Sequence, residues 1–167
     1  ISMDIKLELL LNKAEILMLL KEYDSSLDEI ESIEEFNEEL SEEYLFTLNM
    51  LKGQCYRENK YYRDALEVYK SLKEGDGALD KSKILCININ IIGIYILLRY
   101  NRNIRKHIDE SLVLISSNRQ LYKEKRGAEI FSGLAKGFKF ISEDERAAEY
   151  YNHAIHSAKR NKQYEIL

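Results

Sequence analysis

The chain has 167 residues, of which 45% are apolar and 32% are charged, and its formal net charge is −4. This size and composition fit one domain or a short repeat array that buries a core. The longest apolar stretch, 84–98, is interrupted by Asn88 and Asn90, and no basic segment precedes an apolar run at the start. The sequence therefore predicts neither a membrane-spanning helix nor a signal peptide, and favours a cytoplasmic protein.

Apolar residues recur with a helical period along nearly the whole chain, as Leu7, Leu10, Leu11 and Ala14 illustrate. Proline is absent, so no ring removes a backbone donor inside a helix. Ser41 and Ser142 each precede acidic residues and are predicted N-caps. The pattern predicts eight helices, at 4–20, 24–39, 42–59, 62–74, 79–99, 102–116, 119–141 and 143–161, with a loop at 75–77.

An internal repeat relates these helices to one another. Ala135 is followed by an aromatic residue, Phe138, and then by Ala147, Tyr151 and Ala154 in the next helix. Small residues at such positions allow two helices of a hairpin to approach closely, while large residues fill the space to the next hairpin. The same frame fits Gly53, Tyr56, Ala65, Tyr69 and Leu72; Ala14, Leu17, Ser26, Ile30 and Ile33; and, in the third repeat, Gly93 and Ile96.

This pattern resembles the tetratricopeptide repeat (TPR) family. The resemblance implies an all-α fold, a superhelical stack of four antiparallel helix hairpins at 4–39, 42–75, 79–116 and 119–161, within one domain spanning 1–167. The repeats are longer than the 34 residues of the family and lack its terminal proline. Longer units of this kind are similar to the C-terminal domains of bacterial peptide-sensing transcriptional regulators, which implies binding of a short peptide.

By the same resemblance, the first helix of each hairpin lines a concave groove. A side-chain amide such as Gln54 or Asn90 can pair with a peptide backbone, and basic side chains can bind a carboxylate. The chaperone type of carboxylate clamp is not expected, because Met50 and Gln54 stand where that clamp has lysine and asparagine. The predicted groove residues are Met50, Gln54, Arg57, Asn90, Ile94, Lys136 and Lys139.

No sequence motif indicates catalysis, a cofactor or a metal. Glu149, His153 and His156 have a helical spacing that metal ligands can share, but they flank core positions and are expected to face solvent. Cys55 and Cys86 lie among apolar residues and are expected to be buried thiols. The sequence therefore predicts a binding module and no enzyme.

Charge is distributed unevenly along the chain. Residues 1–80 contain 20 acidic and 9 basic residues, whereas residues 81–167 contain 9 acidic and 16 basic residues. The basic part lacks a nucleic-acid recognition motif and the whole chain is acidic, so direct nucleic-acid binding is not expected. The expected partner is a protein or a short peptide. Two alternatives remain open: a structural adaptor that forms a homodimer or contacts a fused effector, and head-to-tail contact between two copies.

Overall fold

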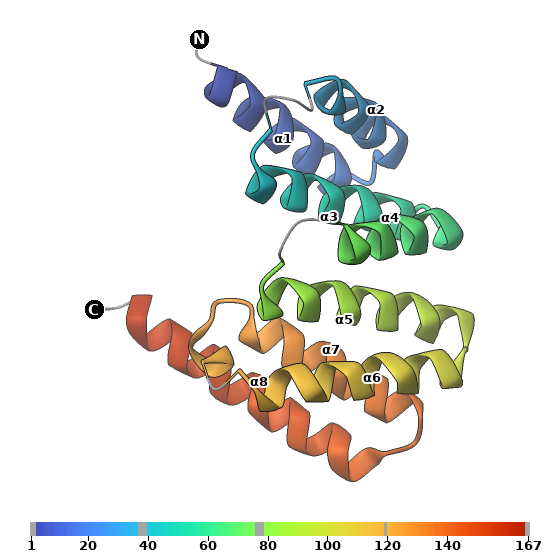
Figure 1. The fold of residues 1–167 in the computed structure, drawn as a ribbon, viewed down its shortest axis with the longest axis vertical. Helices are drawn as coiled ribbons and strands as arrows, with labels where there is room; N and C mark the ends of the chain where they lie inside the picture. Colours follow the sequence, from blue (N-terminus) through green and yellow to red (C-terminus); the bar gives the residue numbers. More distant parts are fainter. Residues whose placement is uncertain (1–2, 37–39, 76–78, 119, 166–167) are drawn as a thin grey trace. The chain divides into compact units, whose positions relative to one another are not determined.

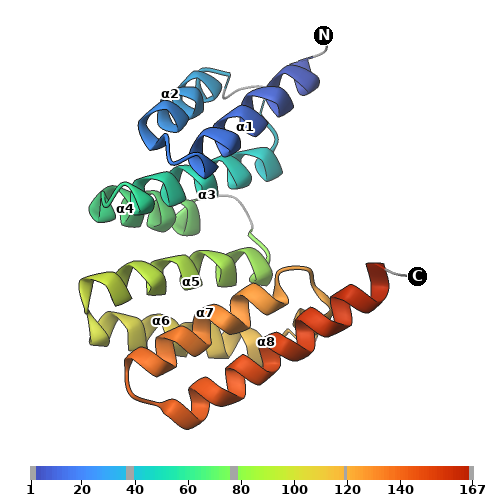
Figure 2. The same ribbon diagram turned by 180° about the vertical axis from the view of Figure 1, so that it is seen from behind.

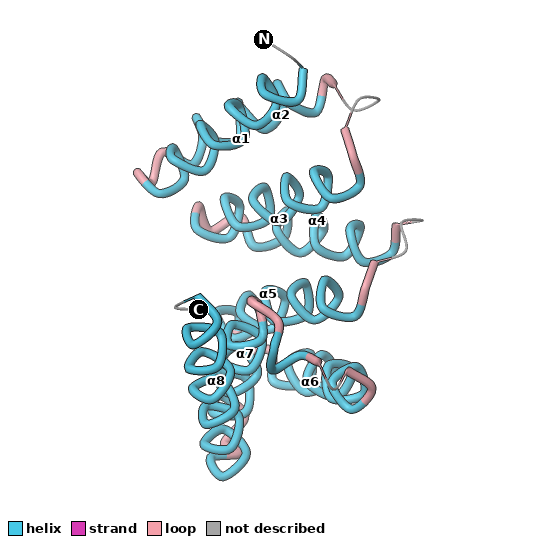
Figure 3. Tube along the Cα trace, turned by 90° about the vertical axis from the view of Figure 1, so that its left-hand side faces the viewer, coloured by secondary structure: helices cyan, strands magenta, loops and turns pink. Residues whose placement is uncertain are grey.

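The computed structural model describes residues 3–36, 40–75, 79–118 and 120–165. Within these ranges all regular structure is helical, as Figure 3 shows, and there are eight α-helices. The prediction of an all-α fold with eight helices is confirmed. The elements are α1 (Met3–Leu19), α2 (Tyr23–Glu34), α3 (Glu42–Glu58), α4 (Tyr62–Glu74), α5 (Lys81–Leu98), α6 (Asn101–Ser116), the 3-10 helix η2 (Leu121–Lys123), α7 (Gly127–Phe140) and α8 (Asp144–Glu165).

The chain divides into two compact units, residues 1–77 and 78–167. In unit 1, α1 packs against α2, α3 packs against α4, and α2 also contacts α3 (Figure 1). In unit 2, α5 pairs with α6 and α7 pairs with α8, while α7 also packs along α5 (Figure 2). Each unit thus contains two of the four predicted hairpins.

The same turn joins the two helices of every hairpin. After α3, Lys60 has a left-handed φ of 66°, its N–H donates to the Arg57 carbonyl, and the Tyr61 N–H donates to the Tyr56 carbonyl. This is a Schellman motif, which satisfies carbonyl groups that a helix end would otherwise expose. The left-handed residues of the four turns are Lys21, Lys60, Arg99 and Ser142, and the carbonyls that accept from the following N–H belong to Leu17, Tyr56, Tyr95 and Phe138.

These turns correct the alignment of the third repeat. Lys21, Lys60 and Arg99 are 39 residues apart, and Ser142 follows after 43. Tyr95 therefore occupies the place of Tyr56, and the predicted anchors Gly93 and Ile96 are wrong by one residue. The small-residue rule failed because Ile92 stands at the place where the other repeats have alanine or glycine.

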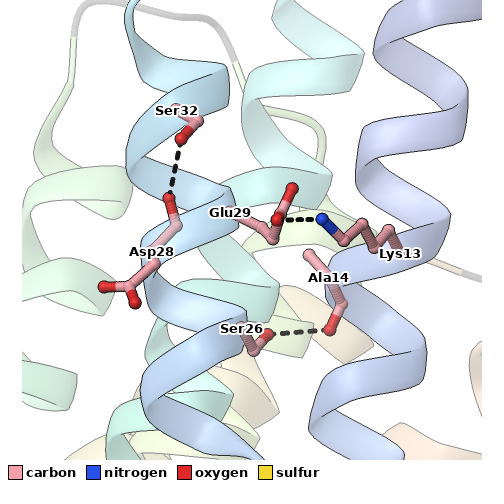
Figure 4. A network of polar contacts seen from close by, with 6 residues as sticks. All are labelled: Lys13, Ala14, Ser26, Asp28, Glu29 and Ser32. Carbon is pink, nitrogen blue, oxygen red and sulfur yellow. Dashed lines mark hydrogen bonds and ion pairs between the residues drawn. The ribbon is translucent and has the colours of Figure 1, made fainter.

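Unit 1 is held together by an aliphatic core between α1, α2 and α3. Ser26 replaces the alanine that other repeats have at this place, and its hydroxyl donates to the Ala14 carbonyl at 2.7 Å (Figure 4). The same hydroxyl lies 3.3 Å from the Cys55 sulfur. Above this contact, Lys13 forms an ion pair with Glu29 across the α1–α2 pair. The buried core residues are Leu7, Ala14, Ile30, Ile33, Leu48, Leu51 and Cys55.

Unit 2 depends on close approach between α5, α6 and α7. A Cβ atom on Gly133 would stand 2.8 Å from the Cβ of Ile89, and one on Gly137 would stand 3.0–3.1 Å from Ile108 and Ile92. These distances leave no room for a side chain, so glycine is what allows α7 to pack this closely.

Four predicted boundaries differ from the structure. The second helix ends at Glu34, because further glutamates at its C-terminus oppose the helix dipole; residues 37–39 of the prediction lie outside the described ranges. The fifth begins at Lys81, where the Asp80 carboxylate accepts the Lys83 N–H at 2.8 Å. The seventh begins at Gly127, not at 119. Ser142 ends α7 in the left-handed turn and is not the predicted N-cap of α8.

Ser41 is the N-cap that the sequence predicts. Its side chain accepts a hydrogen bond from the Tyr44 N–H at 3.2 Å, and Glu42 and Glu43 occupy the first turn of α3. This cap satisfies one of the free N–H groups at the start of the helix.

By length and composition, α5 is one described helix apolar enough to cross a bilayer, and half of it is buried inside the protein. Its buried Asn88 donates to the Ser111 hydroxyl at 3.1 Å, and Ser111 donates to the His107 carbonyl at 2.7 Å. A polar group inside a helical core needs such partners. These contacts are typical of a packed core helix, as in many soluble proteins.

Candidate functional site: the outer face of the first helices

The repeat relationship defines a candidate binding surface on the first helix of each hairpin, which we call the first-helix face. It comprises the positions of Met50, Gln54 and Arg57 on α3 and their equivalents on the other first helices. Because the two units are described separately, the face is considered once in each unit.

On α3, all three predicted residues are half-buried and line the helix surface. Arg57 is engaged by its neighbour, since its Nε and Nη2 atoms donate to Glu58 Oε1 at 3.0 and 2.7 Å. Gln54 makes no hydrogen bond to any residue that the structure describes. Its amide therefore retains the donors and acceptor that a peptide backbone would pair with.

On α5, the structure places different residues on this face from those predicted. Ile94 is fully buried, and the Asn90 side chain donates to the carbonyl of Cys86 at 2.9 Å within its own helix. With the corrected repeat alignment, the equivalents of Met50, Gln54 and Arg57 are Ile89, Gly93 and Ile96.

Gly93 is the distinctive position of this face. A Cβ built on it would meet nothing within 4 Å, unlike those on Gly133 and Gly137. The surface above Gly93 is therefore open, and a ligand backbone can approach the helix closely there. Ile89 and Ile96 lie one turn before and after it on the same side of α5, so the surroundings of this opening are apolar.

On α7, Lys136 and Lys139 are both exposed, as the groove prediction requires. Gly133 faces Ile89 and Gly137 faces Ile92, so α5 and α7 run in the same direction. Lys136 lies between the two glycines in sequence and is therefore level with the region of Gly93 along the helix axis. Unit 2 combines an open glycine position with two neighbouring cationic side chains.

Sequence reasoning missed Gly93 and Ile96 as members of this face, although a signal was present. Tyr56 and Tyr95 are 39 residues apart, which is the exact spacing of the first two hairpin turns. Aligning the repeats on these aromatic residues instead of on small residues gives the observed register.

The titratable groups give no indication of catalysis. Both cysteines are free and buried, as predicted, and burial raises the pKa of the Cys86 thiol to about 11, an effect that the nearby Arg126 lowers in part. Burial also raises the pKa of Cys55, although the hydrogen bond from Ser26 lowers it. Such thiols stay protonated and unreactive at neutral pH.

The histidine pair on α8 has a packing role. His153 is half-buried, contrary to the prediction that it faces solvent, and its Nδ1 lies 2.8 Å from the Tyr122 hydroxyl. Its Nε2 lies 3.6 Å from the Glu149 carboxylate, while His156 is exposed. No group of three or more potential metal ligands occurs among the described residues.

Comparisons with known proteins add no assignment. A scan against protein-family models, a search of curated proteins and a search of solved structures found no match to this chain.

Proposed function

We propose that this chain is a TPR-like module that binds a short peptide or an extended protein segment, and that it is the ligand-sensing part of a cytoplasmic bacterial regulator. The observation that carries the proposal is the open position at Gly93 beside Lys136 and Lys139 in unit 2. A superhelical arrangement of the four hairpins is part of this proposal.

The chemistry of the face favours a peptide with an anionic group. Ile89 and Ile96 offer apolar contact, Gly93 allows the peptide backbone to approach, and the two lysines can bind a carboxylate. In unit 1, Gln54 offers an amide for backbone pairing. We expect binding without chemical conversion of the peptide.

The test is a screen of a library of short fluorescent peptides by polarisation, followed by variants of the protein. We expect the double variant K136A/K139A to weaken the best peptide by about 10- to 100-fold, because two charge-assisted contacts are lost. G93W should block the same peptide. The matched control is K159A, which removes an equally exposed lysine from α8.

Two results would contradict the proposal. One is a library that contains no peptide bound with micromolar affinity. The other is a peptide whose affinity falls equally in K136A/K139A and in K159A, since general charge attraction would then explain the binding.

The alternative function, a structural adaptor, is favoured by a separate observation. The exposed side of α1 is strongly apolar, which is a common property of interaction surfaces. This surface lies on α1 and does not include the residues proposed to bind peptide.

A further inference from the structure

An apolar stripe runs along the exposed side of α1 and the turn that follows it. The four residues follow the helical period and project within a narrow arc of the helix surface. Asn12 lies near the middle of the same arc and is also exposed. The stripe consists of Ile5, Leu9, Ile16 and Leu20, which are 51%, 57%, 56% and 62% exposed.

The equivalent side of α3 shows what such a stripe is built to contact. The repeat relationship places Leu48 and Cys55 where α1 has Leu9 and Ile16, and Leu51 where it has Asn12. All three α3 residues are buried in the core shared with α1 and α2. This side of a first helix thus packs against other helices, and on α1 it has no helix to contact within the described part of unit 1.

The spacing within the stripe identifies a second copy of α1 as the fitting occupant. Ile5 and Leu9 are four residues apart, Leu9 and Ile16 are seven apart, and Ile16 and Leu20 are four apart. This order reads the same in both directions. An antiparallel copy therefore brings Ile5 opposite Leu20 and Leu9 opposite Ile16, with Asn12 at the centre, as a two-fold interface requires.

The charges on α1 are compatible with such a pair. Between Ile5 and Leu20 the helix carries two lysines and two glutamates, so it has no net charge although unit 1 is acidic. Lys13, which would lie near the two-fold axis, is already paired with Glu29. The pairing therefore does not leave this ammonium group without a counter-charge.

We propose that the protein forms a symmetric homodimer through antiparallel packing of α1 against α1 of a second copy, with the stripe buried between them. This interface is independent of the proposed peptide site. Loss of one activity in a variant therefore does not imply loss of the other.

The first experiment measures the mass of the full chain in solution by light scattering and analytical ultracentrifugation over a range of concentrations. We expect a dimer, and we expect L9E/I16E to raise its dissociation constant by about 100-fold or more, because charges replace apolar contacts on both copies. The matched control I155E places a charge at an exposed apolar site of α8 and should leave the dimer intact.

The second experiment tests the two-fold register by oxidative cross-linking. N12C should form a disulfide between two copies, whereas L9C alone should not, and an equal mixture of L9C and I16C should give the mixed disulfide. The native Cys55 and Cys86 are buried and will not interfere.

Three results would overturn the proposal. A strictly monomeric chain at high concentration would exclude the dimer. Species larger than a dimer that are lost in I155E and not in L9E/I16E would indicate head-to-tail contact instead. Efficient cross-linking of L9C alone, without cross-linking of N12C, would exclude the antiparallel register.

Discussion

The ring of Tyr69 lies directly against the Cα atom of Gly53. A Cβ atom on that glycine would stand 2.6 Å from two ring carbons, which is well inside van der Waals contact. Tyr69 is fully buried, so its ring has no solvent-filled space into which it can move. This contact sets the distance between α3 and α4.

We therefore expect G53A to destabilise the protein. Overpacking a closed core costs about 1–3 kcal/mol, which exceeds the gain of up to about 1 kcal/mol from replacing a helical glycine with alanine. Urea unfolding monitored by circular dichroism would measure the change in the free energy of unfolding.

The matched control for G53A is G93A. Nothing lies within 4 Å of its added Cβ, so only the helix preference acts, and we expect stabilisation by about 0.5–1 kcal/mol. If both variants are stabilised to the same extent, the close contact between Gly53 and Tyr69 is incorrect.

Ser26 occupies a place where two other repeats have alanine, which gives a second prediction. S26A should cost no more than about 1 kcal/mol, because the Ala14 carbonyl loses one donor but the small side chain still fits. S26V should cost more, about 1–3 kcal/mol, because its extra methyl group faces Ala14 and Cys55. Equal stability of the two variants in urea would show that the space around residue 26 is not tightly filled.

The pKa of Cys86 gives a prediction of pH dependence. Burial raises this pKa from the ordinary 9.0 to about 11, so the folded state holds the thiol proton more tightly than the unfolded state. The resulting stability is fully present below pH 9 and is lost as the pH rises toward 11, by an amount of about 3 kcal/mol. Urea unfolding of wild type and C86A between pH 8 and 11 would measure it. A pH slope that is the same in both proteins would contradict the assignment.

The segment before α7 gives a fourth prediction. The Ser157 hydroxyl donates to the Tyr122 carbonyl at 3.2 Å, Asn161 donates to the Glu124 carbonyl at 2.9 Å, and Tyr122 and His153 share a hydrogen bond. We expect N161A to increase amide hydrogen exchange in residues 120–126 while leaving exchange in α1–α4 unchanged. The exposed variant N152A on the same helix is the control. Unchanged exchange in N161A would show that this bond does not hold the segment.

The sequence by itself determined the helices and their pairing. Helical periodicity, the absence of proline and the short connections were enough, because these signals are local and need no knowledge of distant contacts. The cap at Ser41 belongs to the same class, since a side chain bonds an N–H three residues away. The repeating hairpin was also visible, through small and aromatic residues at fixed spacing.

Only the tertiary structure decided which residues occupy the candidate site. Ile94 and Gly93 are adjacent in sequence, yet the first is fully buried and the second faces open space. A stretch as uniformly apolar as α5 carries no periodic signal that could separate its buried side from its exposed side. The same reason applies to Gly127, where a Cβ would stand 2.3 Å from the Leu121 carbonyl oxygen. Its role depends on how closely two segments pack, which local sequence preference does not specify.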